Sequence, residues 1–113
     1  MIRMELIEAI IKPFKLDDVQ EILMKMGING ATITEVKRHA SLKKPAQPSA
    51  TYWIDFHPMI KLEVVVPAER RADAIEGILH AAKTGKLGDG MIFVSPVVQA
   101  IRIRTGEQGI DAV

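Results

Sequence analysis

The sequence contains no cysteine, so disulfide bonds and thiolate chemistry are excluded from its fold and its function. It also lacks any apolar run near the roughly 20 residues that a membrane-spanning helix needs. The N-terminus has no signal-peptide pattern, because Arg3, Glu5 and Glu8 interrupt its apolar residues. A cytoplasmic protein is the simplest interpretation of these absences.

An excess of charge of one sign is also lacking. The formal net charge is +1 at pH 7, which gives no bulk attraction toward nucleic acid or a membrane surface. Aromatic residues make up 4% of the chain, and Phe14, Phe56 and Phe93 do not fall in the motif with which RNA-recognition domains stack bases. We therefore expect no nucleic-acid partner. The three histidines have no metal-ligand spacing, so no metal site is predicted.

What is present predicts a single domain, residues 1–113, in which 48% of the residues are apolar. Residues 4–12 alternate and are apolar on nearly both faces, which predicts a strand in the middle of a sheet. Apolar residues then recur at helical spacing from Leu16 to Met26, and Gly27 is a helix stop signal. The β-branched residues of 31–37 predict a second strand.

The segment 38–51 loses this periodicity and contains two prolines and three basic residues. We predict an exposed loop without regular structure. Loops of this length are uncommon in compact domains and are often functional. An inert surface excursion is the alternative. The basic residues would meet an acidic partner or simply keep the loop soluble. The candidate contacts to a partner are Arg38, Ser41, Lys43 and Lys44.

The second half of the chain repeats the pattern. A third strand is predicted over 52–66, with a bulge or bend at His57-Pro58. Pro67 opens a second helix, whose buried stripe is expected to contain Ala72, Ile75, Ile78, Leu79 and Ala82. A fourth strand is expected over 91–94 and a break at Ser95-Pro96. An extended piece over 97–104 would place Arg102 and Arg104 on one side, and residues 106–109 read as a loose polar tail.

This order of elements predicts the α+β, ferredoxin-like βαββαβ arrangement, with a four-stranded antiparallel sheet, both helices on one face, a long loop and a C-terminal strand. One face of such a sheet carries no helix. Because the first strand is apolar on both sides, we expect a symmetric homo-oligomer to cover the open face.

The stretch Thr84-Gly85-Lys86-Leu87-Gly88-Asp89-Gly90 is the candidate ligand site. Glycines leave backbone N–H groups uncovered, and such loops cradle phosphates, here with Lys83 and Lys86 nearby to supply charge. A plain helix-to-strand turn is the alternative. Arg102 and Arg104 suit phosphate oxygens, although the residues by themselves favour a solvated strand face with ion pairs to Glu5 or Glu8.

Five blocks of this sequence, in order, resemble the P-II nitrogen-regulatory signal-transduction family. They cover nearly the whole chain: Ile10-Ile11-Lys12-Pro13-Phe14-Lys15-Leu16-Asp17, Thr34-Glu35-Val36-Lys37, Lys61-Leu62-Glu63-Val64-Val65-Val66-Pro67, the glycine stretch with Ile92-Phe93-Val94, and Ile101-Arg102-Ile103-Arg104-Thr105-Gly106-Glu107. The resemblance implies a cytoplasmic homotrimer that binds adenine nucleotides between subunits, reads 2-oxoglutarate beside Mg-ATP, and signals through a long T-loop, here about 38–51. The regulated partner would be a membrane transporter or an enzyme.

The resemblance also implies the residues of the nucleotide site. Ile10 and Thr32 would lie near the base, with Glu63 and Val65 close by. Gly88, Asp89 and Gly90 would hold the phosphates, Thr84 would face the same cleft, and the arginines would reach the phosphates across the subunit boundary. The complete set is Ile10, Thr32, Glu63, Val65, Thr84, Gly88, Asp89, Gly90, Arg102 and Arg104.

Three departures from the family pattern change the expected ligand. Met91 and Met59 stand where the family has a basic residue and a lysine that meets 2-oxoglutarate. The loop has no glycine or tyrosine, and Leu42 replaces the glutamine that completes the Mg and 2-oxoglutarate site. We therefore expect ADP or AMP to be favoured over ATP, and 2-oxoglutarate and Mg to be doubtful ligands, in a divergent regulator of nitrogen or energy status. A conventional ATP and 2-oxoglutarate sensor is the alternative.

An enzyme on the same fold is the competing class. No nucleophile–base pair and no paired carboxylates converge by spacing, so we expect no catalytic residue. Multiple turnovers of ATP at a substantial rate would favour the enzyme instead.

Overall fold

The computed structural model describes residues 3–43 and 52–113. The strands are β1 (Met4–Ile11), β2 (Thr32–Lys43), β3 (Tyr52–Pro67) and β4 (Gly90–Val97). The helices are α1 (Leu16–Lys25) and α2 (Arg71–Ala82). Short 3-10 helices, η1 (Pro13–Lys15) and η2 (Ala68–Arg70), lead into them, and η3 (Gly109–Ala112) lies near the C-terminus.

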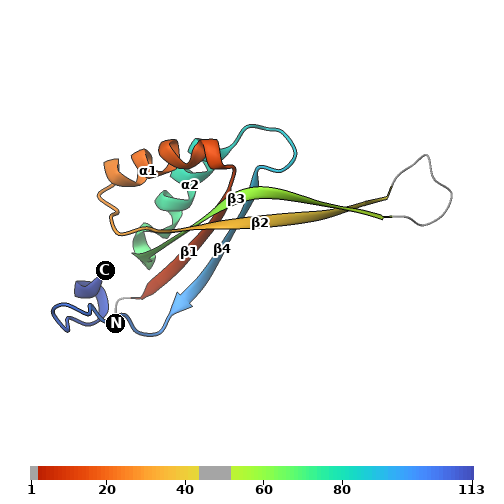
Figure 1. Cartoon of the computed structure of the whole chain (residues 1–113). Coiled ribbons are helices and arrows are strands. Elements are labelled where there is room, and N and C mark those ends of the chain that lie inside the picture. Colours follow the sequence, from red (N-terminus) through yellow and green to blue (C-terminus); the bar gives the residue numbers. More distant parts are fainter. Residues whose placement is uncertain (1–2, 44–51) are drawn as a thin grey trace.

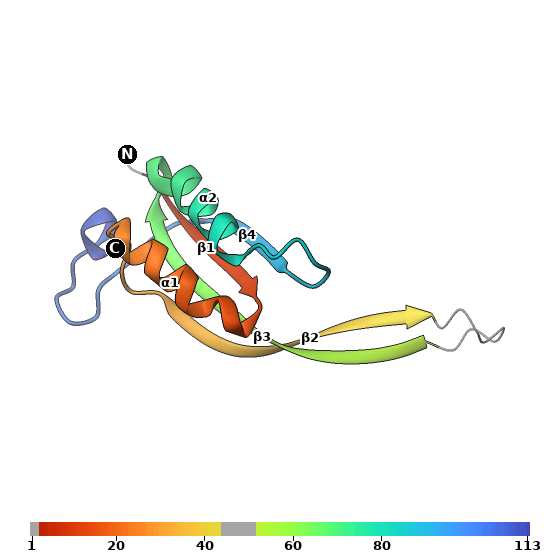
Figure 2. The same cartoon turned by 90° about the horizontal axis from the view of Figure 1, so that it is seen from above.

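The four strands form one antiparallel sheet in the order β2-β3-β1-β4, and both helices cover the same face of it (Figures 1 and 2). This confirms the ferredoxin-like α+β fold expected from the order of elements. β1 pairs with β3 on one side and β4 on the other, so its predicted central position is also confirmed. A strand flanked on both sides and covered by helices explains why it is so rich in isoleucine.

The core lies between the helices and one face of the sheet. From β1 it takes Ile7, Ala9 and Ile11, which alternate with half-buried residues on the open face. Alternate residues of β3 and one stripe of each helix complete it: Leu62, Val64, Val66, Val19, Leu23, Ala74, Ile78 and Ala82. Burial of one such large aliphatic side chain contributes about 1.5–3 kcal/mol, so this layer dominates the stability of the fold.

The buried stripe of α2 differs in part from the prediction. Ile78 and Ala82 are buried and Ile75 packs partly against the core, but Ala72 is exposed and Leu79 is 53% exposed. Residues 74, 78 and 82 follow the i, i+4, i+8 spacing of one helix face, so residues 72 and 79 lie outside that stripe.

β2 and β3 continue well beyond the body of the molecule as a two-stranded arm (Figure 1). The prediction of an irregular segment from residue 38 was wrong at its start, because residues 38–43 pair one-to-one with 57–52. Arg38, Ser41 and Lys43 therefore lie in β2, whereas Lys44 and the rest of 44–51 lie outside the described residues. Pairing with β3 overrides the weak local periodicity, since cross-strand hydrogen bonds do not require alternating apolar residues.

The expected bulge at His57-Pro58 is absent, because the register remains one-to-one through the described pair Lys37–Pro58. β3 pairs with β1 only from Ile60 to Pro67. Before Ile60, the edge of β3 that faces away from β2 has no partner strand among the described residues. Proline is tolerated at such an edge, where its missing N–H removes no ladder hydrogen bond. The molecule is accordingly elongated, with principal extents of 59 × 25 × 23 Å.

β4 also differs from the prediction, because it continues through Ser95-Pro96 to Val97, with Pro96 opposite Glu5. β4 is an edge strand, which again tolerates proline. The C-terminal strand expected over 97–104 does not form. Ile101 makes only an isolated bridge to Gln108, and the chain between them turns back.

The C-terminal turn forms because Gly106, at φ 74°, adopts the left-handed conformation that reverses the chain. The sheet offers this segment no partner strand, and Ile101 and Ile103 remain exposed. The tail is not loose either, since the N–H of Gly109 donates to the carbonyl of Ala100 at 2.9 Å and η3 follows. Within 3–43 and 52–113, no helix is both long and apolar enough to cross a membrane.

Candidate functional site

The glycine loop, defined here as residues 83–90, joins α2 to β4 and is organised around the carboxylate of Asp89. Asp89 Oδ2 accepts hydrogen bonds from the backbone N–H groups of Thr84 and Gly85, both at 2.9 Å, and Oδ1 accepts one from the Thr84 hydroxyl. The Thr84 hydroxyl oxygen in turn accepts from the N–H of Lys86 at 3.1 Å. The family resemblance implied that Asp89 holds the phosphates, but the carboxylate oxygens of Asp89 accept hydrogen bonds from the loop itself.

Lys12 connects this loop to the end of β1. Its Nζ lies 3.1 Å from Asp89 Oδ1 and donates to the Thr84 hydroxyl at 3.2 Å. Its side chain is 18% exposed, so the ion pair is partly shielded from water. Sequence reasoning missed this role. The available signal was that Lys12 directly follows the central strand, whose last residue, Ile11, pairs with Gly90.

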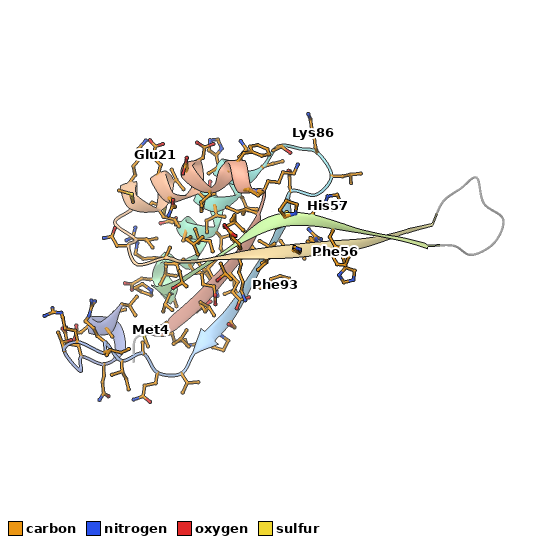
Figure 3. All side chains as sticks on the ribbon, in the orientation of Figure 1. Met4, Glu21, Phe56, His57, Lys86 and Phe93 are labelled. Carbon is orange, nitrogen blue, oxygen red and sulfur yellow. The ribbon has the colours of Figure 1, made fainter. Side chains whose placement is uncertain are left out.

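These hydrogen bonds fix the charge of the loop. The pKa of Asp89 is held well below its ordinary value, mainly by the hydrogen bond from the Thr84 hydroxyl. The Thr84 N–H, Lys12 and the Gly85 N–H lower this pKa further, whereas burial opposes them. Asp89 is therefore ionised at neutral pH and balanced by Lys12. Lys83 and Lys86 are exposed, and Lys86 projects outward from the loop (Figure 3). The loop thus presents a net positive surface to an anion.

Gly90 places the loop against the backbone of β1. Its φ is 114°, and a Cβ atom at this position would lie 1.7 Å from the carbonyl oxygen of Ile10. Only glycine fits this close approach. The structure therefore brings together five of the predicted residues, Ile10, Thr84, Gly88, Asp89 and Gly90.

A second group of predicted residues lines a cavity of about 860 Å³ elsewhere on the chain. Thr32 and Glu63 face each other across β2 and β3, and Val65 follows two residues along the same face. Arg102 closes the cavity from the C-terminal turn. Sequence reasoning missed further lining residues, and the paired glycines after α1 were the signal for some of them: Gly27, Asn29, Gly30, Arg70, Ala112 and Val113.

The glycine loop and Arg102 lie at opposite ends of β4. The glycine loop leads into the start of β4, and the C-terminal turn follows its end, so roughly 25 Å of strand separates them. Figures 1 and 2 show the loop and the C-terminal segment at opposite ends in both views. One chain cannot bring Arg102 to the glycine loop of the same chain.

Arg102 and Arg104 do not share a strand face, because the strand expected there is a turn. Arg102 lies 3.7 Å from Glu107 through Nε and donates from Nη2 to the carbonyl of Ala112 at 3.3 Å. Arg104 is exposed near the tip of the turn. The expected alternative of a pair to Glu5 does not occur among the described residues, since Glu5 is engaged by Arg71 at 2.9 Å.

The two methionines occupy different environments. Met59 is 5% exposed and apart from the helix-side core cluster, whereas Met91 is 49% exposed directly after the glycine loop. On the arm, Arg38 and Phe56 are exposed, and His39 lies against Phe56 with a ring separation of 6.0 Å. The part of the chain that the structure describes contains no group of three residues able to hold a metal ion.

Replacing Asp89 with asparagine is expected to lower the free energy of unfolding by the contribution of the ionised carboxylate, which depends on pH. Because the folded-state pKa is depressed, the contribution of the ionised carboxylate is full above the unfolded value of about 4 and is lost as pH falls through the folded-state value. Urea unfolding at a series of pH values would therefore show a difference in the free energy of unfolding between wild type and Asp89→Asn. This difference should be constant from about pH 5 to 8 and become smaller below about pH 4. A difference unchanged at acid pH would contradict this assignment.

Known proteins match this chain over nearly its whole length. The family model described as nitrogen regulatory protein P-II matches residues 4–107. Nitrogen regulatory protein P-II of Haemophilus influenzae is 54% identical, and that of Cereibacter sphaeroides 52%; each match covers 97% of this chain and 100% of the relative.

Two solved structures are similar to this chain. Arabidopsis thaliana PII, described as bound to citrate, has a TM-score of 0.81 at 34% identity, covering 98% of this chain and 92% of that protein. Bacillus subtilis GlnK has a TM-score of 0.86 at 28% identity, covering 98% and 99%. On the strength of the full-length match and of the fold that carries it, this chain belongs to the nitrogen regulatory protein P-II family, whose members are signalling regulators and not enzymes.

Proposed function

We propose that this protein binds an adenine nucleotide between the subunits of a homotrimer and passes the nucleotide state to a partner protein through the β2–β3 arm. One observation carries the proposal. The positively charged glycine loop and Arg102, which lines the cavity, lie at opposite ends of β4 in one chain. A ring of subunits would bring the loop of one against the cavity of the next, and the nucleotide would close the contact.

The open face of the sheet supports the assembly. Leu6 and Ile10 are only half-buried there, and the neighbouring strand β4 adds Met91 and Phe93, each about half exposed. Exposed apolar side chains on an uncovered sheet face favour association with another copy. Binding in the cytoplasm, where adenine nucleotides are abundant, fits both the site and the absence of cysteine.

The charges at the site favour ADP or AMP over ATP. Lys12 is neutralised by Asp89, and Met91 supplies no charge where the loop enters β4, so a third phosphate gains little. Met59 is buried and apolar, so a dicarboxylate beside it would lose water without gaining a cation. The citrate bound by the Arabidopsis relative supports an anion site in that protein. Conventional sensing of ATP and 2-oxoglutarate is the second candidate.

The arm is the element that we expect to contact the partner, a membrane transporter or an enzyme. It extends away from the body (Figure 1). Its β3 strand carries the exposed Phe56, labelled in Figure 3, and its β2 strand carries the exposed bases Lys37 and Arg38. A nucleotide bound near the base of the arm would favour one arm arrangement, and the partner would bind that arrangement better. The nucleotide can shift the arm only by as much as its own affinity differs between the two arrangements.

Calorimetric titration with ATP, ADP and AMP, each with and without Mg and 2-oxoglutarate, tests the proposal. We expect ADP or AMP to bind with no effect of 2-oxoglutarate. Removal of a charge-assisted phosphate contact costs about 1.5–3 kcal/mol, so Arg102→Ala and Arg104→Ala should each weaken binding by roughly tenfold or more. Arg3→Ala, at an exposed arginine outside both residue groups, serves as the control. Tightening by 2-oxoglutarate would favour the second candidate, and no nucleotide binding at all would overturn both.

A further inference from the structure

The C-terminal turn holds Arg102 by its backbone on both sides. The N–H of Arg102 donates to the carbonyl of Glu107 at 2.8 Å, and the carbonyl of Arg102 accepts from the N–H of Gly106 at 2.7 Å. Ile101 and Gln108 close the turn with an isolated bridge. The backbone of Arg102 is therefore fixed relative to Glu107, although both residues lie at the surface.

Glu107 also orients the side chain of Arg102. Its Oε1 accepts from the hydroxyl of Thr105 at 2.8 Å and lies 3.7 Å from Arg102 Nε, while the Thr105 hydroxyl oxygen accepts from the N–H of Glu107 at 3.3 Å. Thr105 thus fixes the carboxylate, and the carboxylate faces the Nε edge of the guanidinium. At the other edge, Nη2 donates to the carbonyl of Ala112 at 3.3 Å.

Arg102 lines the cavity while the Glu107 carboxylate and the Ala112 carbonyl face two of its nitrogens. Arg70 also lines that cavity, but its Nη2 donates to the carbonyl of Met26 at 2.6 Å and so caps α1. Arg102 is therefore the better-placed cation for an anionic ligand. A long charged side chain loses much rotamer freedom on binding, and a residue that holds it beforehand removes part of that cost.

We propose that Glu107 is a positioning residue that pre-orients Arg102 for the phosphate of the bound nucleotide, an inference that rests on the proposed function. Glu107 does not touch the ligand. It faces Nε while the Ala112 carbonyl accepts from Nη2, so a phosphate in the cavity would bind from the Nη edge without displacing Glu107. Arg104, with no such partner among the residues described, contributes charge alone.

The test is a double-mutant cycle on nucleotide affinity, measured by calorimetry with ADP on the full chain. Glu107→Gln keeps an acceptor for Thr105 but removes the charge that faces Arg102. Pre-ordering one long side chain is worth roughly two- to tenfold in affinity, so we expect binding to weaken by that factor. In an Arg102→Ala background the same change should have no effect, whereas in an Arg104→Ala background the full effect should persist.

The outcomes separate this inference from the proposed function. If the wild type binds no nucleotide, the proposed function fails. If the wild type binds and Arg102→Ala weakens binding, but Glu107→Gln acts equally in both backgrounds, the positioning role is wrong. Tighter binding by Glu107→Gln would show that the carboxylate competes with phosphate, and would also overturn it. Circular dichroism and the sedimentation profile of each variant exclude a general loss of folding or assembly.

Discussion

Gly90→Ala is expected to destabilise the protein by more than about 4 kcal/mol or to prevent folding. The new Cβ would lie 1.7 Å from the carbonyl oxygen of Ile10, a backbone atom of the central strand that cannot rotate away. Relief of this clash requires β4 to separate from β1, which breaks the pairing of Gly90 with Ile11 and its neighbours. Urea unfolding followed by circular dichroism, at matched protein concentration, measures the loss.

Gly85→Ala is the matched control for Gly90. Gly85 has a φ of 81° in the same loop, but a Cβ atom there would meet nothing within 4 Å. Only the left-handed backbone penalty remains, about 1–2 kcal/mol. A cost for Gly90→Ala similar to that of Gly85→Ala would contradict the close contact between β4 and β1.

Met91→Lys is expected to raise the affinity for ATP by roughly tenfold or more. The new ammonium would enter at the end of the glycine loop, where a charge-assisted contact to phosphate is worth about 1.5–3 kcal/mol. Met91 is 49% exposed in the single chain, so the new ammonium can reach water there, and the sedimentation profile of the variant checks that the added charge leaves the association of subunits intact. Calorimetry with ATP, ADP and AMP should show the largest gain for ATP and the smallest for AMP.

Met24→Lys provides the control for this gain. Met24 is 69% exposed on α1, outside the glycine loop and the Arg102 cavity, and the change adds the same charge. It should leave all three affinities unchanged apart from a small long-range term that salt screens. Equal gains for ATP and AMP, or equal effects of the two methionine changes, would contradict a specific phosphate contact at position 91.

The fold could be predicted where burial dictates the sequence. β1 is rich in isoleucine because it is the central strand, flanked by β3 and β4 and covered by the helices on one face. α1 stops just before Gly27, whose φ of 74° lies in the left-handed region. The arm and the end of β4 could not be predicted in the same way. Their residues are paired by backbone hydrogen bonds at sheet edges, where side-chain alternation is weak and proline is tolerated.

The candidate site could be predicted as a set of residue types but not as a geometry. The glycine loop was evident from composition, yet the hydrogen bonds that Thr84 and Gly85 donate to Asp89, and the ion pair with Lys12 more than 70 residues away in the sequence, were not. The prediction of a C-terminal strand was wrong because it also depended on contacts with a distant part of the chain. Alternation of Ile101 and Ile103 with arginines indicates a strand only if a partner edge exists, and the sheet provides none there.

The strand order also has a consequence for how the chain folds as it is synthesised. β2 and β3 are neighbours in the sequence and can pair as soon as both are synthesised. β1 must wait for β3 and then for β4, whose pairing joins Met4 to Val97. Contacts so distant in sequence form late, because the entropy of closing the long loop must be overcome first. Until the ribosome has released β4, the isoleucine-rich β1 keeps an unpaired edge. That interval is the one in which a nascent chain is most prone to aggregate or to need a chaperone.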